Sequence, residues 1–271
     1  MQRRDFVLSG TALLGGWALA ANAQRAKSVA AAGSKITLGA AINKAGRQRM
    51  LSQRMAKAYA QLGLGVLPER SMKILESSKV LFELQLAELL EFSPSPDIKA
   101  LYQELDASWR GYREVLLTAP HNEAGLEIYR SSEAVLKIAH RATAELEKLS
   151  GKSAGKLVNI SGRQRMLSQR TAKLYMLREW KIPQATDQEL KTARDEFKQA
   201  LALLKAAPES TPEVKSHLAL AETQWLFFDR ALDSKGQSGQ EEDISRRNVA
   251  TTSERLLEIF ESVTDLYEKG V

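Results

Sequence analysis

The sequence GRQRMLSQR, residues 46–54, occurs a second time without change at residues 162–170. The match extends further, because thirteen of the seventeen positions from 43 to 59 are identical to those from 159 to 175. Trp109 and Trp225 share the same offset of 116 residues. Near the end of each unit the offset becomes 121, where Ser132-Glu133 corresponds to Ser253-Glu254. Such a period indicates a tandem duplication, with one unit at 35–150 and the other at 151–271.

Each unit has the start and stop signals of four helices. In the first unit these are expected at about 34–62, 68–92, 96–119 and 122–149, with Ser95 and Asn122 as N-terminal caps and prolines at positions 68 and 96. The second unit repeats the pattern: helices reach about 180 and then begin at about 186, 212 and 241, the third of them capped by Thr211. No segment alternates with the period of a strand. The sequence therefore predicts an all-α protein.

Four helices with short connections form an antiparallel up-down-up-down bundle. A five-residue link at 151–155 spans up to about 17 Å, which is enough to place the first helices of the two units side by side and parallel. We therefore expect two tandem antiparallel four-helix bundles in a pseudo-two-fold arrangement. The alternative is one continuous helix over 124–180, which would place the bundles end to end.

The repeated nonapeptide has two packing faces when it is placed on a helix. Leu51 and Met55 lie on an apolar face, whereas Arg49 lies at the centre of a face of small and polar residues. Two such arginines facing each other would repel, and a planar oxyanion between them would remove the conflict. The expected ligand-binding residues are Arg49, Arg165, Gly46 and Gly162, and the expected supporting residues are Arg54, Arg170, Ser52, Ser168, Gln53 and Gln169.

The remaining arginines of the motif point away from this face. Arg54 and Arg170 are expected to be bundle-side residues paired to an acid, and Arg47 and Arg163 to be solvated or flanking. An alternative explanation of the repeat is a ligand-free interface in which the arginines pair with glutamates across the contact between the two units.

Composition limits the chemistry. The chain has no cysteine and three scattered histidines, so no metal site, disulfide or bound cofactor is expected. No nucleophile has a convergent base, so no catalytic residue is assigned and an enzyme is not expected. The net charge is +6, but no basic stripe is interleaved with aromatic residues, and nucleic acid is not an expected partner.

The N-terminus has the pattern of an export signal. Arg3-Arg4 precedes a short apolar run at 7–20 and the small residues Ala21-Asn22-Ala23. We expect a twin-arginine signal peptide at 1–23, a flexible leader at 24–34, and a periplasmic mature chain without a transmembrane span; the alternative is an uncleaved anchor.

The repeated motif also resembles a known family of sensor domains. The residues from Ile42 to Arg54 are similar to the first-helix motif of the periplasmic domains of nitrate/nitrite sensor kinases and, more closely, to the N-terminal domain of type IV pilus methyl-accepting chemotaxis transducers (the NarX/PilJ type). In the sensor kinases nitrate binds at the dimer seam between first-helix arginines, which correspond here to Arg49 and Arg165. The resemblance implies an exported sensor-like protein that binds nitrate or nitrite and reports to a membrane sensor, a transporter or a chemotaxis protein. The alternative is a ligand-free module of an envelope or type IV pilus/chemosensory complex.

Overall fold

The computed structural model of the chain describes residues 36–233 and 239–270, so the expected signal peptide and leader lie outside the described residues. The compact unit Ile36–Val271 contains both repeats. Within the described residues every regular element is an α-helix, which confirms the all-α prediction. The helices are α2 (Leu38–Gly63), α3 (Pro68–Phe92), α4 (Pro96–Leu116), α5 (Asn122–Ser150), α6 (Ser153–Glu179), α7 (Asp187–Ala206), α8 (Pro212–Asp233) and α9 (Gly239–Glu268).

Most helices begin where the sequence signals place them. The Ser95 hydroxyl accepts from the N–H of Ile98 at 3.3 Å, and Pro96 is the first helical residue. Thr186 and Glu189 form a reciprocal capping box at the start of α7. Two starts were wrong: α2 begins after the cap Thr37, not at 34, and α5 is capped by the imidazole of His121, not by Asn122. His121 can act as the cap in place of Asn122 because Nδ1 of its ring accepts a hydrogen bond from a backbone N–H, as a carboxamide oxygen does.

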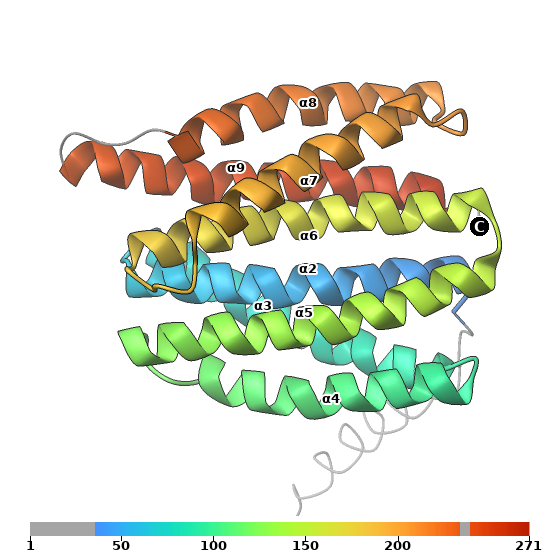
Figure 1. Ribbon diagram of the computed structural model, residues 1–271, viewed down its shortest axis with the longest axis horizontal. Coiled ribbons are helices and arrows are strands. Elements are labelled where there is room, and N and C mark those ends of the chain that lie inside the picture. The colour runs from blue at the N-terminus through green and yellow to red at the C-terminus, as the bar shows by residue number, and fades with distance from the viewer. Residues whose placement is uncertain (1–35, 234–238, 271) are drawn as a thin grey trace, which may run out of the picture. The chain divides into compact units, whose positions relative to one another are not determined.

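The helices form two bundles that share a central contact (Figure 1). Helices α2 to α5 pack on one another, helices α6 to α9 do the same, and α2 lies along α6. Gly151, with φ of 59°, ends α5 in the left-handed conformation, and α6 starts two residues later in the opposite direction. Because α2 and α6 both run antiparallel to α5, they are parallel to each other. The bundles therefore lie side by side, and the continuous-helix alternative is wrong.

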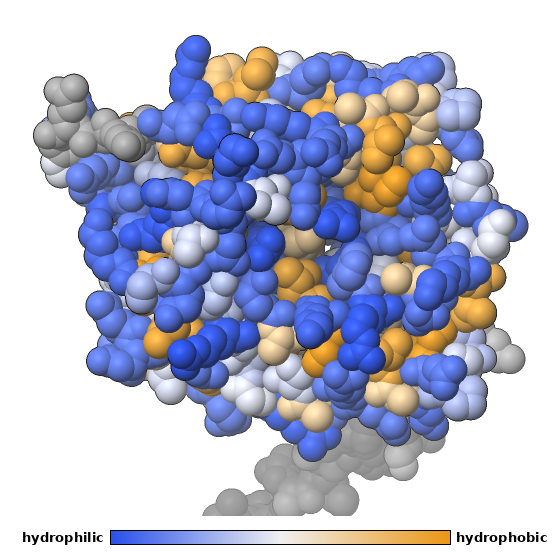
Figure 2. Space-filling model, in the orientation of Figure 1, coloured by the Kyte–Doolittle hydropathy of each residue, from blue (hydrophilic) through white to orange (hydrophobic). Residues whose placement is uncertain are grey.

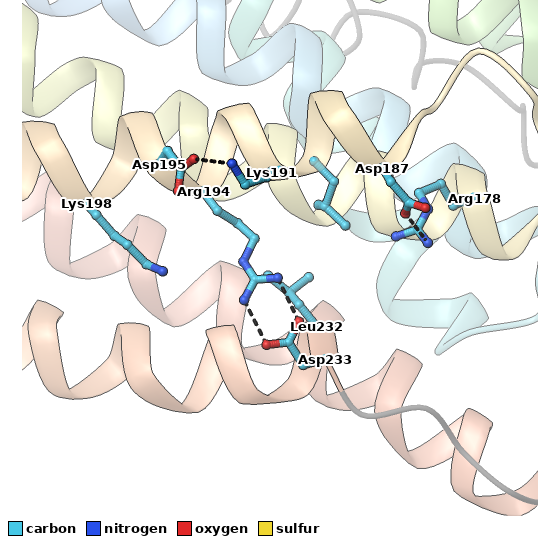
Figure 3. Close-up of a pocket in the computed structure, with 9 residues that line it drawn as sticks. Arg178, Asp187, Lys191, Arg194, Asp195, Lys198, Leu232 and Asp233 are labelled. Atoms are coloured by element: carbon cyan, nitrogen blue, oxygen red, sulfur yellow. Dashed lines mark hydrogen bonds and ion pairs between the residues drawn. The ribbon is translucent and has the colours of Figure 1, made fainter.

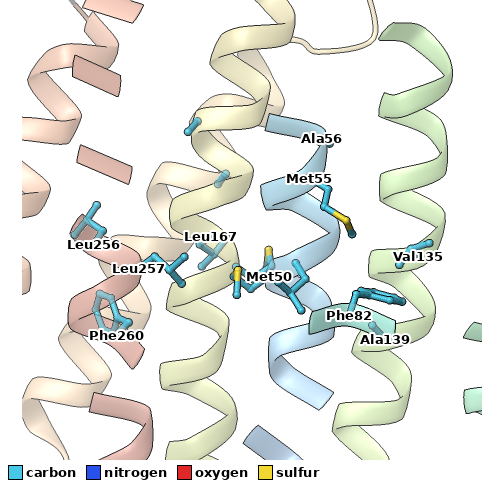
Figure 4. Packing of buried hydrophobic residues seen from close by; sticks show 14 of the residues in the cluster. Met50, Met55, Ala56, Phe82, Val135, Ala139, Leu167, Leu256, Leu257 and Phe260 are labelled. Atoms are coloured by element: carbon cyan, nitrogen blue, oxygen red, sulfur yellow. The ribbon is translucent and has the colours of Figure 1, made fainter. Parts of the chain in front are cut away.

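Aromatic stacking fills equivalent places in the two cores. Trp109 stacks on Phe82 with ring centroids 4.3 Å apart, and Trp225 stacks on Phe197 at 3.9 Å. The apolar core is continuous through the α2–α6 contact, where Met50 lies between side chains from the helices on both sides (Figure 4). Burial of this kind is the main source of stability for both bundles.

A tryptophan of the second repeat packs on glycines of the first. Trp180, just after α6, lies so close to Gly63 and Gly125 that a Cβ atom on Gly125 would stand 2.8 Å from the indole ring, and one on Gly63 would overlap it. Glycine at both positions therefore permits the ends of α2 and α5 to approach α6. Among the described helices, none is both long and apolar enough to cross a membrane.

Candidate functional site

The two arginines at the centre of the repeated motif meet where α2 and α6 cross, at a place we call the seam. Both side chains are fully buried. A Cβ atom on Gly46 would stand 3.2 Å from Nη2 of Arg49 and 3.5 Å from Nη2 of Arg165, and a Cβ on Gly162 would have the same two distances with the arginines exchanged. The two glycines thus leave the space that the paired guanidinium groups occupy. The structure brings together all four residues that the sequence selected as ligand-binding.

Arg165 has strong partners on its side of the seam. Its Nη1 donates to a Glu261 carboxylate oxygen at 2.6 Å, and its Nη2 donates to Oδ1 of Asn43 at 2.7 Å. Burial lowers the pKa of Arg165 and Glu261 opposes that effect. Burial alone would raise the pKa of Glu261, but the charges of Arg165 and Arg47 outweigh it and lower the pKa to about 2. Glu261 is therefore a carboxylate at neutral pH.

Arg49 has weaker partners. Its Nη1 lies 3.3 Å from Nδ1 of His140, and its Nη2 donates to the backbone oxygen of Asn159 at 3.3 Å. In the described parts of the chain, no carboxylate forms an ion pair with Arg49, whereas Arg165 has one in Glu261. The buried Nε has no hydrogen-bond partner there in either arginine. Burial lowers the pKa of Arg49 to about 9, helped by the charges of Arg163 and Arg165. Arg49 therefore remains a buried cation at neutral pH.

His140 and Glu261 occupy equivalent places in the two repeats. They are 121 residues apart, the offset that also relates Ser132 to Ser253, and each contacts Nη1 of its seam arginine. Burial and then the charge of Arg49 lower the pKa of His140, so its ring is neutral near pH 7. A neutral ring accepts from Arg49 when its proton is on Nε2. The seam thus has pseudo-two-fold geometry with a carboxylate on one side only.

The polar residues of the motif fasten each first helix to its own bundle. Gln48 donates to the backbone oxygen of Phe82 on α3, and Gln164 donates to that of Phe197 on α7. The expected supporting residues Gln53 and Gln169 donate to the backbone oxygens of Ser132 and Ser253. Ser52 and Ser168 instead donate within their own helices, to the backbone oxygens of Arg49 and Arg165, respectively. None of these contacts involves a ligand, and they account for the repetition of the glutamines and serines of the motif.

Two ionic clusters cross between the repeats. In the first cross-repeat cluster, Lys57 and Arg54 of α2 both contact Glu254 of α9, each at 2.5 Å. In the second, Lys173 and Arg170 of α6 contact Glu133 of α5 at 2.6 and 2.9 Å. The sequence correctly predicted an acidic partner for Arg54 and Arg170. The shared acid, Glu254 or Glu133, belongs to the other repeat in each cluster, and Arg170 also contacts Glu189 of its own repeat at 3.4 Å.

Both of the arginines expected to be solvated or flanking have an acidic partner. The Arg47 side chain is 18% exposed and pairs with Glu261 at 2.5 Å. Arg163 is more exposed and pairs with Glu196 at 2.7 Å. The ligand-free alternative expected the seam arginines to pair across the contact. Arg165 does have a glutamate, but Glu261 is on α9 of the same repeat, and among the described residues Arg49 has none.

Two hollows of the surface are lined by neither Arg49 nor Arg165. One of about 490 Å³ beside α7 contains four cations, which already pair with carboxylates; Arg194, for example, pairs with Asp229 and Asp233 (Figure 3). Another of about 660 Å³, between α4 and α5, is lined by three carboxylates, by Arg141 and by His140, so negative charges outnumber positive ones and disfavour an anion. Within the described ranges no group of three or more His, Asp or Glu is arranged to hold a metal ion.

Sequence reasoning missed several residues at the seam. Asn43 and Asn159, and likewise Lys57 and Lys173, are identical at offset 116, so their repetition was visible, but repetition does not say which helix they face. The sequence feature that relates His140 to Glu261 is the 121-residue offset. These two positions lie two residues beyond the last ones at which the repeats are visibly alike.

Both repeats match the model of one protein family. The family model described as type IV pili methyl-accepting chemotaxis transducer N-term (PilJ) matches residues 37–134 and 150–252, which together make up more than half of the chain. Domains of this family are typically periplasmic sensor regions, and the family is one of chemotaxis signalling, not of enzymes. Neither the curated proteins nor the solved structures include a significant match. The chain therefore belongs to the PilJ family of type IV pili methyl-accepting chemotaxis transducer N-terminal domains, of which it carries two tandem copies, and it is a sensory or interaction module related to chemotaxis transducers.

Proposed function

We propose that the protein is a periplasmic sensor-like module that binds a small oxyanion at the seam and reports its presence to a chemotaxis-related partner. The observation that supports this is the pair of fully buried, convergent guanidinium groups, only one of which is neutralised by a described carboxylate. A buried, unpaired charge is costly, and an anion beside Arg49 would remove that cost.

Nitrate and nitrite are the first candidates for the ligand. Nitrate is a trigonal planar oxyanion and nitrite is a bent one, and a guanidinium binds two oxygens of either through two N–H groups. The resemblance to nitrate/nitrite sensors points to the same arginines, Arg49 and Arg165. Acetate has a carboxylate of similar shape and is the natural competitor to test.

Melting curves in nitrate, nitrite, acetate and sulfate, at constant ionic strength against chloride, test this function. A true ligand should raise the stability of the wild type by about 2.7 kcal/mol at a hundred times its Kd. Arg49→Met and Arg165→Met should each reduce affinity about ten- to a hundredfold, because each removes a charge-assisted hydrogen bond. Arg194→Met removes an arginine outside the seam and should keep the response. The absence of any saturable shift, or two independent sites by calorimetry, would refute the proposal.

Export belongs to the same proposal. The signal peptide expected at 1–23 would be cleaved after Ala23, and mass spectrometry of the mature protein should find Gln24 at its N-terminus. Replacing Arg3 and Arg4 with lysine should block export by the twin-arginine route. Undiminished export of that variant would point to the general secretion route instead.

A ligand-free interaction module is the second candidate, and the surface of α8 favours it. Apolar patches interrupt the charged surface of the protein (Figure 2), and Leu220, Leu226 and Phe227 of α8 are more than half exposed. Their equivalents at offset 116 are Glu104, Arg110 and Gly111, so the apolar residues are specific to the second repeat.

The chemistry of that face suggests a protein partner, and a membrane-bound chemotaxis transducer is the one to test. Leu226→Arg, which copies the first repeat, should weaken binding of the purified transducer ectodomain in surface plasmon resonance. Leu117→Arg changes a leucine of similar exposure, 59% against 65%, on the other bundle and should not weaken binding. Equal binding by both variants would exclude the α8 face.

A further inference from the structure

The two seam arginines differ in how many of their donors are used. A guanidinium has five N–H groups. Arg165 makes contacts at 2.6, 2.7 and 3.3 Å, and the shortest is to a carboxylate. Arg49 makes two contacts, both at 3.3 Å and both to neutral acceptors, and Nε has no partner among the described residues in either arginine. The two arginines therefore differ in their Nη groups, and those of Arg49 are less fully hydrogen-bonded.

The surrounding charges show the same asymmetry. On the side of Arg165, Glu261 is shared with Arg47, and Asp265 and Glu268 accept from the amide of Asn43. On the side of Arg49, the position of Glu261 is taken by His140 and that of Asp265 by Ala144. Glu147, the equivalent of Glu268, accepts from the amide of Asn159 and acts to raise the pKa of Arg49, but burial and two neighbouring arginines outweigh it, and Glu196 pairs with Arg163.

We infer that Glu261 acts as a built-in counter-anion for Arg165, so that Arg49 is the principal anchor of the ligand and the seam selects a singly charged oxyanion over a doubly charged one. This inference rests on the proposed function. One uncompensated guanidinium balances one negative charge, and the second charge of a dianion would be buried without a partner. The protein thus supplies the negative charge beside Arg165, whereas a ligand must supply the negative charge beside Arg49.

Calorimetric titration of the full chain with nitrate and with sulfate tests the charge selection. The wild type should bind nitrate at least about tenfold more tightly than sulfate, the scale of one charge-assisted hydrogen bond. Glu261→Gln releases Arg165 and should reduce that ratio about tenfold or more by strengthening sulfate. His140→Glu places a second built-in carboxylate beside Arg49 and should weaken nitrate binding by at least about tenfold. Asp229→Asn, which removes a carboxylate from Arg194 on the outer helices, should leave the ratio unchanged.

Melting curves without any added oxyanion test the asymmetry independently of binding. Arg165→Met removes one of the two cations paired with Glu261 and should lower the Tm, whereas Arg49→Met removes a buried charge without an ion-pair partner and should leave the Tm unchanged or raise it. His140→Glu should raise the Tm by giving Arg49 a partner. Equal losses of Tm in the two arginine variants would overturn the inference.

The outcomes separate this inference from the proposed function. If the wild type binds nitrate and sulfate equally tightly, or if Glu261→Gln leaves their ratio unchanged, the inference is overturned and the proposed function stands. If the wild type binds none of these anions, both are overturned.

Discussion

Removing Glu254 should destabilise the protein strongly, because its two cationic partners would be left without an acid. The Lys57 side chain is fully buried and that of Glu254 is 5% exposed, so neither group is stabilised by water. Breaking such a pair from one side costs about 3–5 kcal/mol. Glu254→Gln keeps the shape of the side chain and removes its charge. We therefore expect this variant to lose about 3–5 kcal/mol in the free energy of unfolding.

The other repeat provides a matched comparison. Glu133 has the same role toward Lys173 and Arg170, but its side chain is 26% exposed, and water can solvate part of the change. Glu133→Gln should therefore lower the free energy of unfolding by about 1–3 kcal/mol. Urea denaturation at pH 7, followed by circular dichroism, measures both values.

A double variant separates the loss of the ion pair from a general packing defect. Lys57→Met removes the stranded cation, so it should recover part of the stability lost in Glu254→Gln, with a coupling free energy of about 1–3 kcal/mol. Strict additivity of the two changes would refute the reasoning. So would a Glu133→Gln variant that is at least as damaging as Glu254→Gln.

Three further predictions concern a close packing contact, stability in acid and the folding of the separate repeats. Gly63→Ala should lower the free energy of unfolding by at least about 1–3 kcal/mol, because the new methyl group overpacks against the indole of Trp180. Gly111→Ala, on an open helix surface, should raise it by about 0.5–1 kcal/mol, and urea denaturation compares the two variants. The pKa of Glu254 is about 2 in the folded protein, below its usual value of 4.5, so the stability that its charge contributes is complete above pH 4.5 and is lost as the pH falls toward 2. Acid denaturation should show this loss, and the free energy of unfolding of Glu254→Gln should depend less steeply on pH in that range. The separate fragments 36–150 and 151–271 should not fold alone, since each would expose its half of the seam, but should regain helical circular dichroism when mixed.

The sequence predicted the helices and the seam well because both depend on local or repeated signals. Pro96 and Pro212 set helix starts through their own backbone geometry, and the helical wheel placed Arg49 on the correct face. The partners of the motif could not be predicted in the same way. Arg54 meets Glu254 only because α9 of the second bundle lies beside α2 of the first, and no local pattern encodes which bundle supplies an acid.

The short turn at Gly151 has an evolutionary consequence. A pair of separate, identical subunits would have to carry the same residue at both positions that flank its two-fold axis. Joining the copies in one chain removes that constraint, and histidine at one position with glutamate at the other is a combination that a pair of identical subunits cannot hold. Fusion also keeps the partner helix at an effective concentration in the millimolar range, so the seam forms in a single molecule at any dilution.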